Sequence, residues 1–100
     1  MNKTILITGA AKRIGKEIAL TYSDLGWNII IHYNSSKDDA EGLAQKINSK
    51  NPDTAKIIQA NLDIDADVER LVQETKDMFD SIDILAVSYT HLTLPTKVSV

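Results

Sequence analysis

Residues 6–19 read LITGAAKRIGKEIA, and the character of the chain changes twice within them. The stretch continues an apolar run, Thr4-Ile5-Leu6-Ile7, of the kind found in strands buried on both faces of a parallel sheet. Gly9 then interrupts the run, and a helical pattern follows from Gly15. Nucleotide-binding sheets hold a phosphate at such a turn, because glycine lets the backbone approach and the helix N-terminus offers unpaired N–H groups. The stretch predicts a phosphate-binding loop; the alternative is a strand-to-helix turn that binds nothing.

Beyond this turn, helical and strand patterns alternate. Buried strands are predicted at 28–31, at 55–60 and from 82 onward, and a second helix at 38–48. Three helical stripes are expected to face the sheet: Ile14, Ile18, Tyr22 and Leu25; Ala40, Leu43, Ala44 and Ile47; and Val68, Leu71, Val72, Thr75, Met78 and Phe79. Gly26 is expected to end the first helix in a left-handed conformation, and Asp63 or Asp65 to cap the third. This alternation predicts an α/β fold with a doubly wound parallel sheet.

The composition limits the classes of partner that this chain is expected to bind. The 100 residues are 43% hydrophobic and 25% charged, which is typical of one soluble globular unit. A net charge of −3, with no basic run longer than two residues, predicts no nucleic-acid partner, and no apolar stretch is long enough to predict a membrane partner. The chain has no cysteine and no signal-peptide pattern, so we expect a cytoplasmic protein.

The end of the second strand predicts the cofactor. About 20 residues beyond the glycines, NAD-binding sheets carry an acidic residue that accepts the ribose 2′-hydroxyl. Here Tyr33 occupies that place, followed by Asn34, Ser35 and Ser36. No carboxylate stands there to repel a 2′-phosphate, and Arg13 and the serine hydroxyls can hydrogen-bond one, so NADPH is favoured. The alternative is that His32 and Tyr33 merely end a strand and the serines merely turn the chain.

These motifs together resemble one enzyme family. Thr-Gly-x-x-x-Arg-x-Gly resembles the Thr-Gly-x-x-x-Gly-x-Gly loop of the short-chain dehydrogenase/reductase family, with Arg13 in place of the middle glycine. The stretches TGAAKRIG, IHYNSS and INSKNPDTAKIIQANLD look like the pteridine reductase branch, and the resemblance covers residues 3–85. It implies a Rossmann-type sheet, of which this chain holds the N-terminal half, and NADPH-dependent reduction of a small pterin or dihydrofolate-type substrate. The cofactor-binding residues so implied are Gly9, Lys12, Arg13, Ile14, Gly15, Tyr33, Asn34, Ser35, Ser36, Asn61 and Leu62.

Some of these roles rest on the resemblance alone. Asn61 stands where the family holds the adenine amino group and Leu62 where it packs the ring, although Asn61 also suits a plain turn. Ser35 stands where the branch commonly carries an arginine to the 2′-phosphate. The 3-oxoacyl-carrier-protein reductases share the same first half and are the alternative enzyme. A non-catalytic NADP-binding module is the alternative of another class.

After Leu85 the family pattern breaks. The family continues with Val-Asn-Asn-Ala, but this chain reads AVSYTHLTLPTKVSV. The family's catalytic Ser and Tyr-x-x-x-Lys are missing; Tyr89 and Lys97 are eight apart with Pro95 between them, so we predict no catalytic residue, no metal ligand and no activity for this chain as written. The parent enzyme is expected to be a homotetramer.

The tail itself has a specific interpretation. Residues 87–96, VSYTHLTLPT, equal the translation of a transposase adapter used in sequencing libraries. We therefore expect an NADP-binding half-domain at 1–85 and a non-native tail at 86–100. In this half-domain the first two helices should cover one face of the sheet and the third helix the other. Because the second face is then half covered, Ile5, Ile7, Ile30 or their neighbours are expected to face water, with the fourth strand an open edge.

Overall fold

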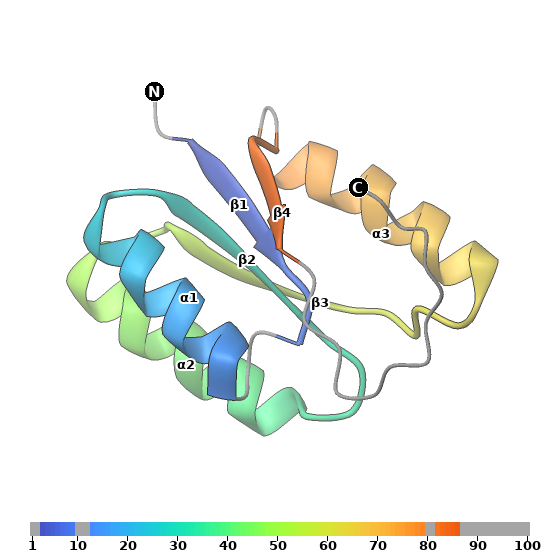
Figure 1. Ribbon diagram of the computed structural model, residues 1–100, viewed down its shortest axis with the longest axis horizontal. Coiled ribbons are helices and arrows are strands. Elements are labelled where there is room, and N and C mark those ends of the chain that lie inside the picture. Colours follow the sequence, from blue (N-terminus) through green and yellow to red (C-terminus); the bar gives the residue numbers. More distant parts are fainter. Residues whose placement is uncertain (1–2, 10–12, 80–81, 87–100) are drawn as a thin grey trace.

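Four parallel strands form the centre of the molecule (Figure 1). The computed structural model describes residues 3–9, 13–79 and 82–86, without the side chain of Arg13. The strands are β1 (Thr4–Ile7), β2 (Asn28–Tyr33), β3 (Ala55–Gln59) and β4 (Ile84–Ala86), in the order β3-β2-β1-β4. This is the N-terminal half of a doubly wound, Rossmann-type sheet, in which the order 3-2-1-4 reverses direction between β1 and β4. The predicted fold class is confirmed.

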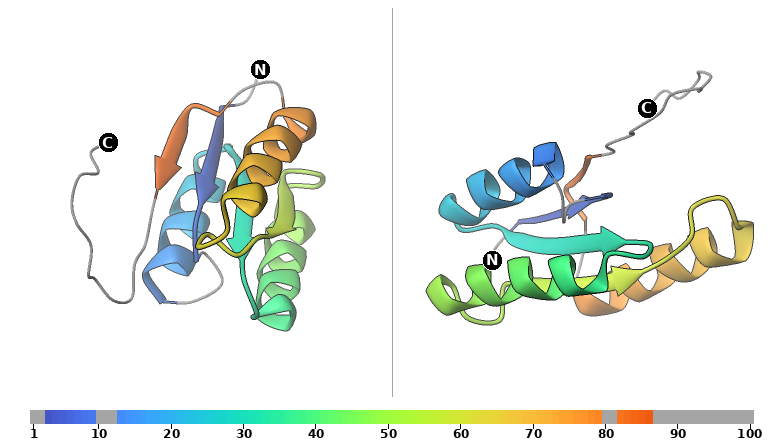
Figure 2. Two further views of the ribbon diagram at one scale, coloured as in Figure 1. Left: turned by 90° about the vertical axis from the view of Figure 1, so that its right-hand side faces the viewer. Right: turned by 90° about the horizontal axis from the view of Figure 1, so that it is seen from below.

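Helices cover both faces of the sheet (Figure 2). They are α1 (Arg13–Asp24), α2 (Lys37–Lys50) and α3 (Asp65–Met78). One core cluster joins α1 and α2 to the strand residues Ile5, Ile7, Ile29, Ile31 and Tyr33. A second cluster joins Leu71 of α3 to Leu6, Ile30, Ile58 and Ala60 on the opposite face. The predicted distribution of helices, two on one face and one on the other, is confirmed.

The expectation that central isoleucines face water is wrong. Ile5, Ile7 and Ile30 are 1%, 0% and 0% exposed. Ile5 and Ile7 lie beneath α1 and α2, and α3 with Met78, Phe79 and Ile82 packs over the face that carries Ile30. The exposed apolar surface lies instead at the edge, where Leu85 of β4 is exposed and β4 pairs only with β1 among the described strands.

The inward face of α1 differs from the prediction. The helix begins at Arg13, two residues before Gly15. Ile14 and Leu25 are 68% and 67% exposed, while the small residues Gly15, Ala19 and Ser23 are buried. These three lie four residues apart on one face, and small side chains let a helix approach a sheet closely. Of the larger side chains in the predicted stripe, only Ile18 and Tyr22 pack against the core, and both are half-buried.

The start of α3 is also not as predicted. Its N-cap is Ile64, without a side-chain hydrogen bond, and Asp65 is already the first helical residue. The amide N–H of Asp63 donates to the side chain of Asn61, so this part of the chain forms a turn before the helix. On the helix itself, Leu71 and Thr75 are buried, but Val72 is exposed. No helix in the described part of the chain is long and apolar enough to cross a membrane.

Most of the proposed tail lies outside the described residues. Ala86 is described and completes β4: it pairs with Ile7, and its carbonyl accepts a hydrogen bond of 2.9 Å from the N–H of Thr8. Tyr89 and Lys97 fall within the part, 87–100, that the structure does not describe. The non-native origin of the tail therefore stays a prediction.

Two glycines allow a matched test of backbone conformation. Gly26 has φ +89°, in the left-handed region expected of it, whereas Gly42 lies inside α2, and a Cβ at either position would meet no atom within 4 Å. We expect Gly26→Ala to lower the free energy of unfolding by about 1 kcal/mol, through backbone strain alone. Gly42→Ala should raise it by about 0.5–1 kcal/mol, because alanine loses less entropy in a helix. Urea unfolding of the two variants measures both; a stabilising Gly26→Ala would contradict the assignment.

Candidate functional site at the carboxyl edge of the sheet

The predicted cofactor residues come from three loops that follow parallel strands. Gly9 follows β1, Asn34–Ser36 follow β2, and Asn61 and Leu62 follow β3. The carboxyl ends of parallel strands share one edge, so the fold brings these three loops together. The strand order reverses at β1 and β4, and doubly wound sheets bind ligands in the crevice at such a reversal.

The glycine turn after β1 is partly described. Gly9 has φ +65°, a conformation that favours glycine over other residues. Lys12 lies outside the described residues, and only the backbone of Arg13 is described. Since α1 begins at Arg13, the N–H groups of Arg13, Ile14 and Gly15 belong to its first turn and have no partner within the helix. The first turn of α1 therefore offers the unpaired N–H groups that bind anions at helix N-termini.

The end of β2 presents polar groups and one buried ring. Tyr33 is only 9% exposed and belongs to the core under α1 and α2, which agrees with the simpler interpretation that it ends a strand. Asn34 and Ser35 are exposed, and Ser36 is the N-cap of α2 although its hydroxyl binds no helix N–H. The groups open to a ligand therefore begin at Asn34.

An open hollow of about 360 Å³ lies at the start of α2, lined by Ser35, Ser36, Lys37, Asp38 and Asp39. A second hollow, of about 220 Å³, shares the two aspartates and adds Lys16 and Lys46. Lys37 is 3.9 Å from Glu41 in an exposed ion pair, which holds it only weakly. The lysines offset the aspartates across the two hollows.

After β3, Asn61 acts in a turn. Its Oδ1 accepts a hydrogen bond of 2.9 Å from the N–H of Asp63, as in an Asx turn. A carbonyl oxygen has two lone pairs, so Oδ1 can still accept from an adenine amino group. Leu62 beside it is exposed, as a side chain that packs on a ring must be before the ring arrives. Both adenine roles stay predictions.

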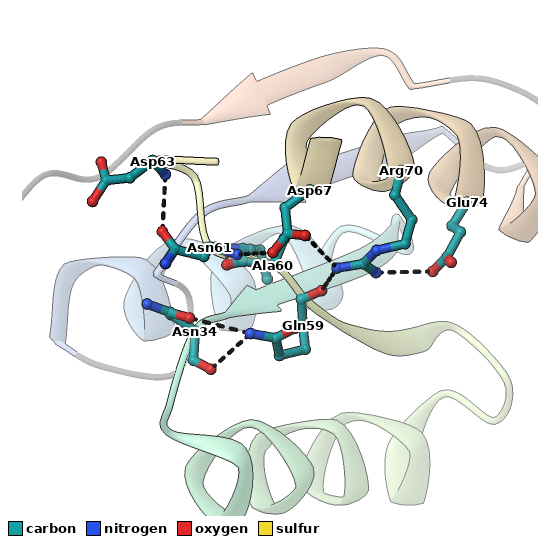
Figure 3. Close-up of polar contacts among 9 residues, drawn as sticks. Asn34, Gln59, Ala60, Asn61, Asp63, Asp67, Arg70 and Glu74 are labelled. Atoms are coloured by element: carbon teal, nitrogen blue, oxygen red, sulfur yellow. Dashed lines mark hydrogen bonds and ion pairs between the residues drawn. The ribbon is translucent and has the colours of Figure 1, made fainter. Parts of the chain in front are cut away.

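A polar network that the sequence did not predict connects these loops (Figure 3). The side-chain amide of Gln59 donates to both the backbone oxygen and the Oδ1 of Asn34, at 3.2 and 3.1 Å. Arg70 of α3 donates to the carbonyl of Gln59 at 2.9 Å and is 3.7 Å from Asp67. The carboxylate of Asp67 accepts the N–H of Asn61 at 2.9 Å. The side chain of Gln59 thus links β3 to the loop after β2, and α3 binds the end of β3 and Asn61. The acidic first turn of α3 was the signal available in the sequence.

His32 is a further residue that the sequence analysis did not assign to the site. It lies on β2 just before Tyr33 and is 5% exposed. Its Nδ1 is 3.3 Å from the N of Gly9, and its Nε2 is 2.8 Å from the carbonyl oxygen of Ala60. A buried histidine at the end of a strand needs partners for both nitrogens, and that requirement was the signal for this role.

The model of the short chain dehydrogenase family matches residues 3–93. The chain belongs to the short-chain dehydrogenase family. A 3-oxoacyl-[acyl-carrier-protein] reductase of Staphylococcus epidermidis is 38% identical over 85 residues, which are 85% of this chain and 34% of that protein. An uncharacterized oxidoreductase of Bacillus subtilis, YmfI, is 37% identical over 98 residues, 98% of this chain and 40% of that protein.

A more distant short-chain dehydrogenase relative comes from a fungus. The tetrahydroxynaphthalene reductase of Pyricularia oryzae is 32% identical over 95 residues, which are 90% of this chain and 33% of that enzyme. This chain thus spans about a third of the length of the curated relatives it matches. In the described part of the chain, no group of three His, Cys, Asp or Glu residues could hold a metal ion.

Proposed function

We propose that this chain is the cofactor-binding part of an NADPH-dependent oxidoreductase that reduces 3-oxoacyl thioesters. The observation that carries the proposal is the meeting of three loops at the carboxyl edge of the sheet: a glycine turn into a helix, a strand end without a carboxylate, and Asn61. The relatives named as 3-oxoacyl-[acyl-carrier-protein] reductases support this substrate class more than the pteridine reductase interpretation that the motifs first favoured.

The residues present fit a dinucleotide phosphate. The unpaired N–H groups in the first turn of α1 would hold the pyrophosphate, since a helix N-terminus favours an anion. Ser35, Ser36 and Lys37 line the hollow that would receive the 2′-phosphate, and its other two lining residues, Asp38 and Asp39, also border the neighbouring hollow that holds Lys16 and Lys46. Asn61 and Leu62 would hold the adenine. The nicotinamide, when bound, supplies the hydride that reduces the substrate carbonyl.

Binding and turnover test the proposal separately. In titrations of this chain followed by calorimetry, NADPH should bind at least about tenfold more tightly than NADH, because one charge-assisted hydrogen bond to the 2′-phosphate is worth about 1.5–3 kcal/mol. The complete enzyme encoded at the same locus should oxidise NADPH with acetoacetyl-coenzyme A in preference to dihydrobiopterin. A preference for dihydrobiopterin would restore the pteridine reductase interpretation, and binding without turnover of either substrate would favour a non-catalytic module.

A further inference from the structure

The side chain of His32, on β2, connects the glycine turn after β1 to the segment after β3. The residue sits near the carboxyl end of β2, and its buried ring contacts Gly9, which is 23 residues before it, and Ala60, which is 28 residues after it. Strand alternation places His32 on the same face as Ile30, the face covered by α3. The ring therefore lies between the glycine turn and the segment that leads into Asn61.

The two contacts require one protonation state of the ring. The carbonyl of Ala60 can only accept, so Nε2 of His32 carries a hydrogen and donates it. The N–H of Gly9 can only donate, so Nδ1 carries a lone pair and accepts. Only the neutral ring with its hydrogen on Nε2 makes both bonds. The Ala60 contact alone would also allow the ring protonated on both nitrogens, and the Gly9 contact excludes that form because it needs the lone pair of Nδ1.

The contact with His32 also occupies the N–H group of Gly9. Gly9 has φ +65°, and its N–H points at the imidazole of His32. That N–H is consequently not available to a phosphate, so the unpaired N–H groups in the first turn of α1 remain to bind the anion. The same ring also binds the carbonyl of Ala60. One rigid side chain therefore fixes the position of the glycine turn relative to the segment that leads into Asn61.

We propose that His32 is a positioning residue for the dinucleotide: through Nδ1 it presets the glycine turn, and through Nε2 it presets the end of β3. The inference rests on the proposed NADPH-binding function. It assigns separable tasks to the two nitrogens, the first for the pyrophosphate half of the cofactor and the second for the adenine half. A histidine that served packing alone would not separate these halves.

Two substitutions separate the nitrogens. In His32→Gln, the amide nitrogen can take the place of Nε2 and still donate to Ala60, but no acceptor remains for Gly9. In His32→Asn, Oδ1 can take the place of Nδ1 and accept from Gly9, but nothing reaches Ala60. Titration of this chain and its variants with NADPH and with adenosine 2′-monophosphate, which lacks the pyrophosphate, compares the whole site with its adenine half.

We expect His32→Gln to raise the Kd for NADPH about tenfold and to leave the Kd for adenosine 2′-monophosphate within about twofold. His32→Asn should raise both constants by a similar factor, because the adenine half is common to both ligands. Equal changes for both ligands in the Gln variant, or no change in either variant, would overturn the assignment of His32.

The unsubstituted chain provides a further readout that does not depend on variants folding. Long-range ¹H–¹⁵N NMR of the imidazole should show a protonated Nε2 and an unprotonated Nδ1, and the Gly9 amide should exchange slowly. A hydrogen on Nδ1 would overturn the proposal by itself. If the unsubstituted chain bound neither ligand, the proposed function would fail; if it bound both and the NADPH-to-monophosphate ratio never moved, only the role of His32 would fail.

Discussion

Ser35→Asp is expected to weaken NADPH binding by about ten- to a hundredfold, while NADH binding stays within about twofold. Ser35 is exposed and lines the hollow at the start of α2. A carboxylate there would face the 2′-phosphate, and like charges in close contact cost on the order of 1–3 kcal/mol at a partly exposed site. NADH carries a 2′-hydroxyl at this position, and a carboxylate can accept a hydrogen bond from that hydroxyl.

The opposite charge gives the matched variant. Ser35→Arg should tighten NADPH binding about tenfold by adding a bidentate partner for the phosphate, again with little effect on NADH. Folding should tolerate both changes, since Ser35 lies in a loop with its side chain open to solvent. Calorimetric titration with both cofactors measures the two ratios. Parallel changes for NADPH and NADH would remove Ser35 from the 2′-phosphate site.

Ile31→Ala should lower the free energy of unfolding by about 2–5 kcal/mol, the range for truncating a fully buried aliphatic side chain. Ile31 is completely buried in β2, between its neighbours Ile7 on β1 and Ile57 on β3, beneath α1 and α2. The cavity left by the lost atoms cannot close easily, because strands flank the position on both sides. For a chain of 100 residues this is a large part of the total stability.

Leu25→Ala is the control for this substitution. Leu25 is an apolar residue of similar size that is mostly exposed in the turn after α1, so its truncation should change stability by no more than about 0.5 kcal/mol. Urea denaturation followed by circular dichroism gives both values. Similar losses for the two variants would mean that the packing described for β2 is incorrect.

The strands were predictable because their signal is local. β1 is a continuous apolar run, and its observed bounds, Thr4–Ile7, are those predicted. Helix faces were less predictable. The stripe through Ile14 and Leu25 has helical spacing, yet the sheet is met by Gly15 and Ala19, whose small side chains carry little hydrophobic signal. Hydrophobic periodicity finds a helix, but it does not show how closely that helix approaches its neighbour.

The loops of the site could be predicted from the sequence, but the residues that hold those loops in place could not. Gly9, Ser35 and Asn61 follow strands, and the parallel topology alone brings such positions to one edge. His32 binds a partner that is distant along the chain, and Asp67 binds one in the preceding turn. In the sequence, each of the two also suits an ordinary structural role. A polar residue reveals a structural role only when its tertiary partners are known.

The pairing of β1 with β4 sets the order in which the chain can fold during synthesis. At the amino end of the pair, the N–H and C=O of Thr4 bind the side chain and the N–H of Asp83, 79 residues later. β1 can pair with β2 as soon as residue 31 leaves the ribosome, whereas its other edge must wait for residue 86. At roughly 5–20 residues per second, that edge of β1 stays open for several seconds. During this interval the nascent chain carries an isoleucine-rich strand with one open edge, and a chaperone that binds extended apolar segments would find a site there.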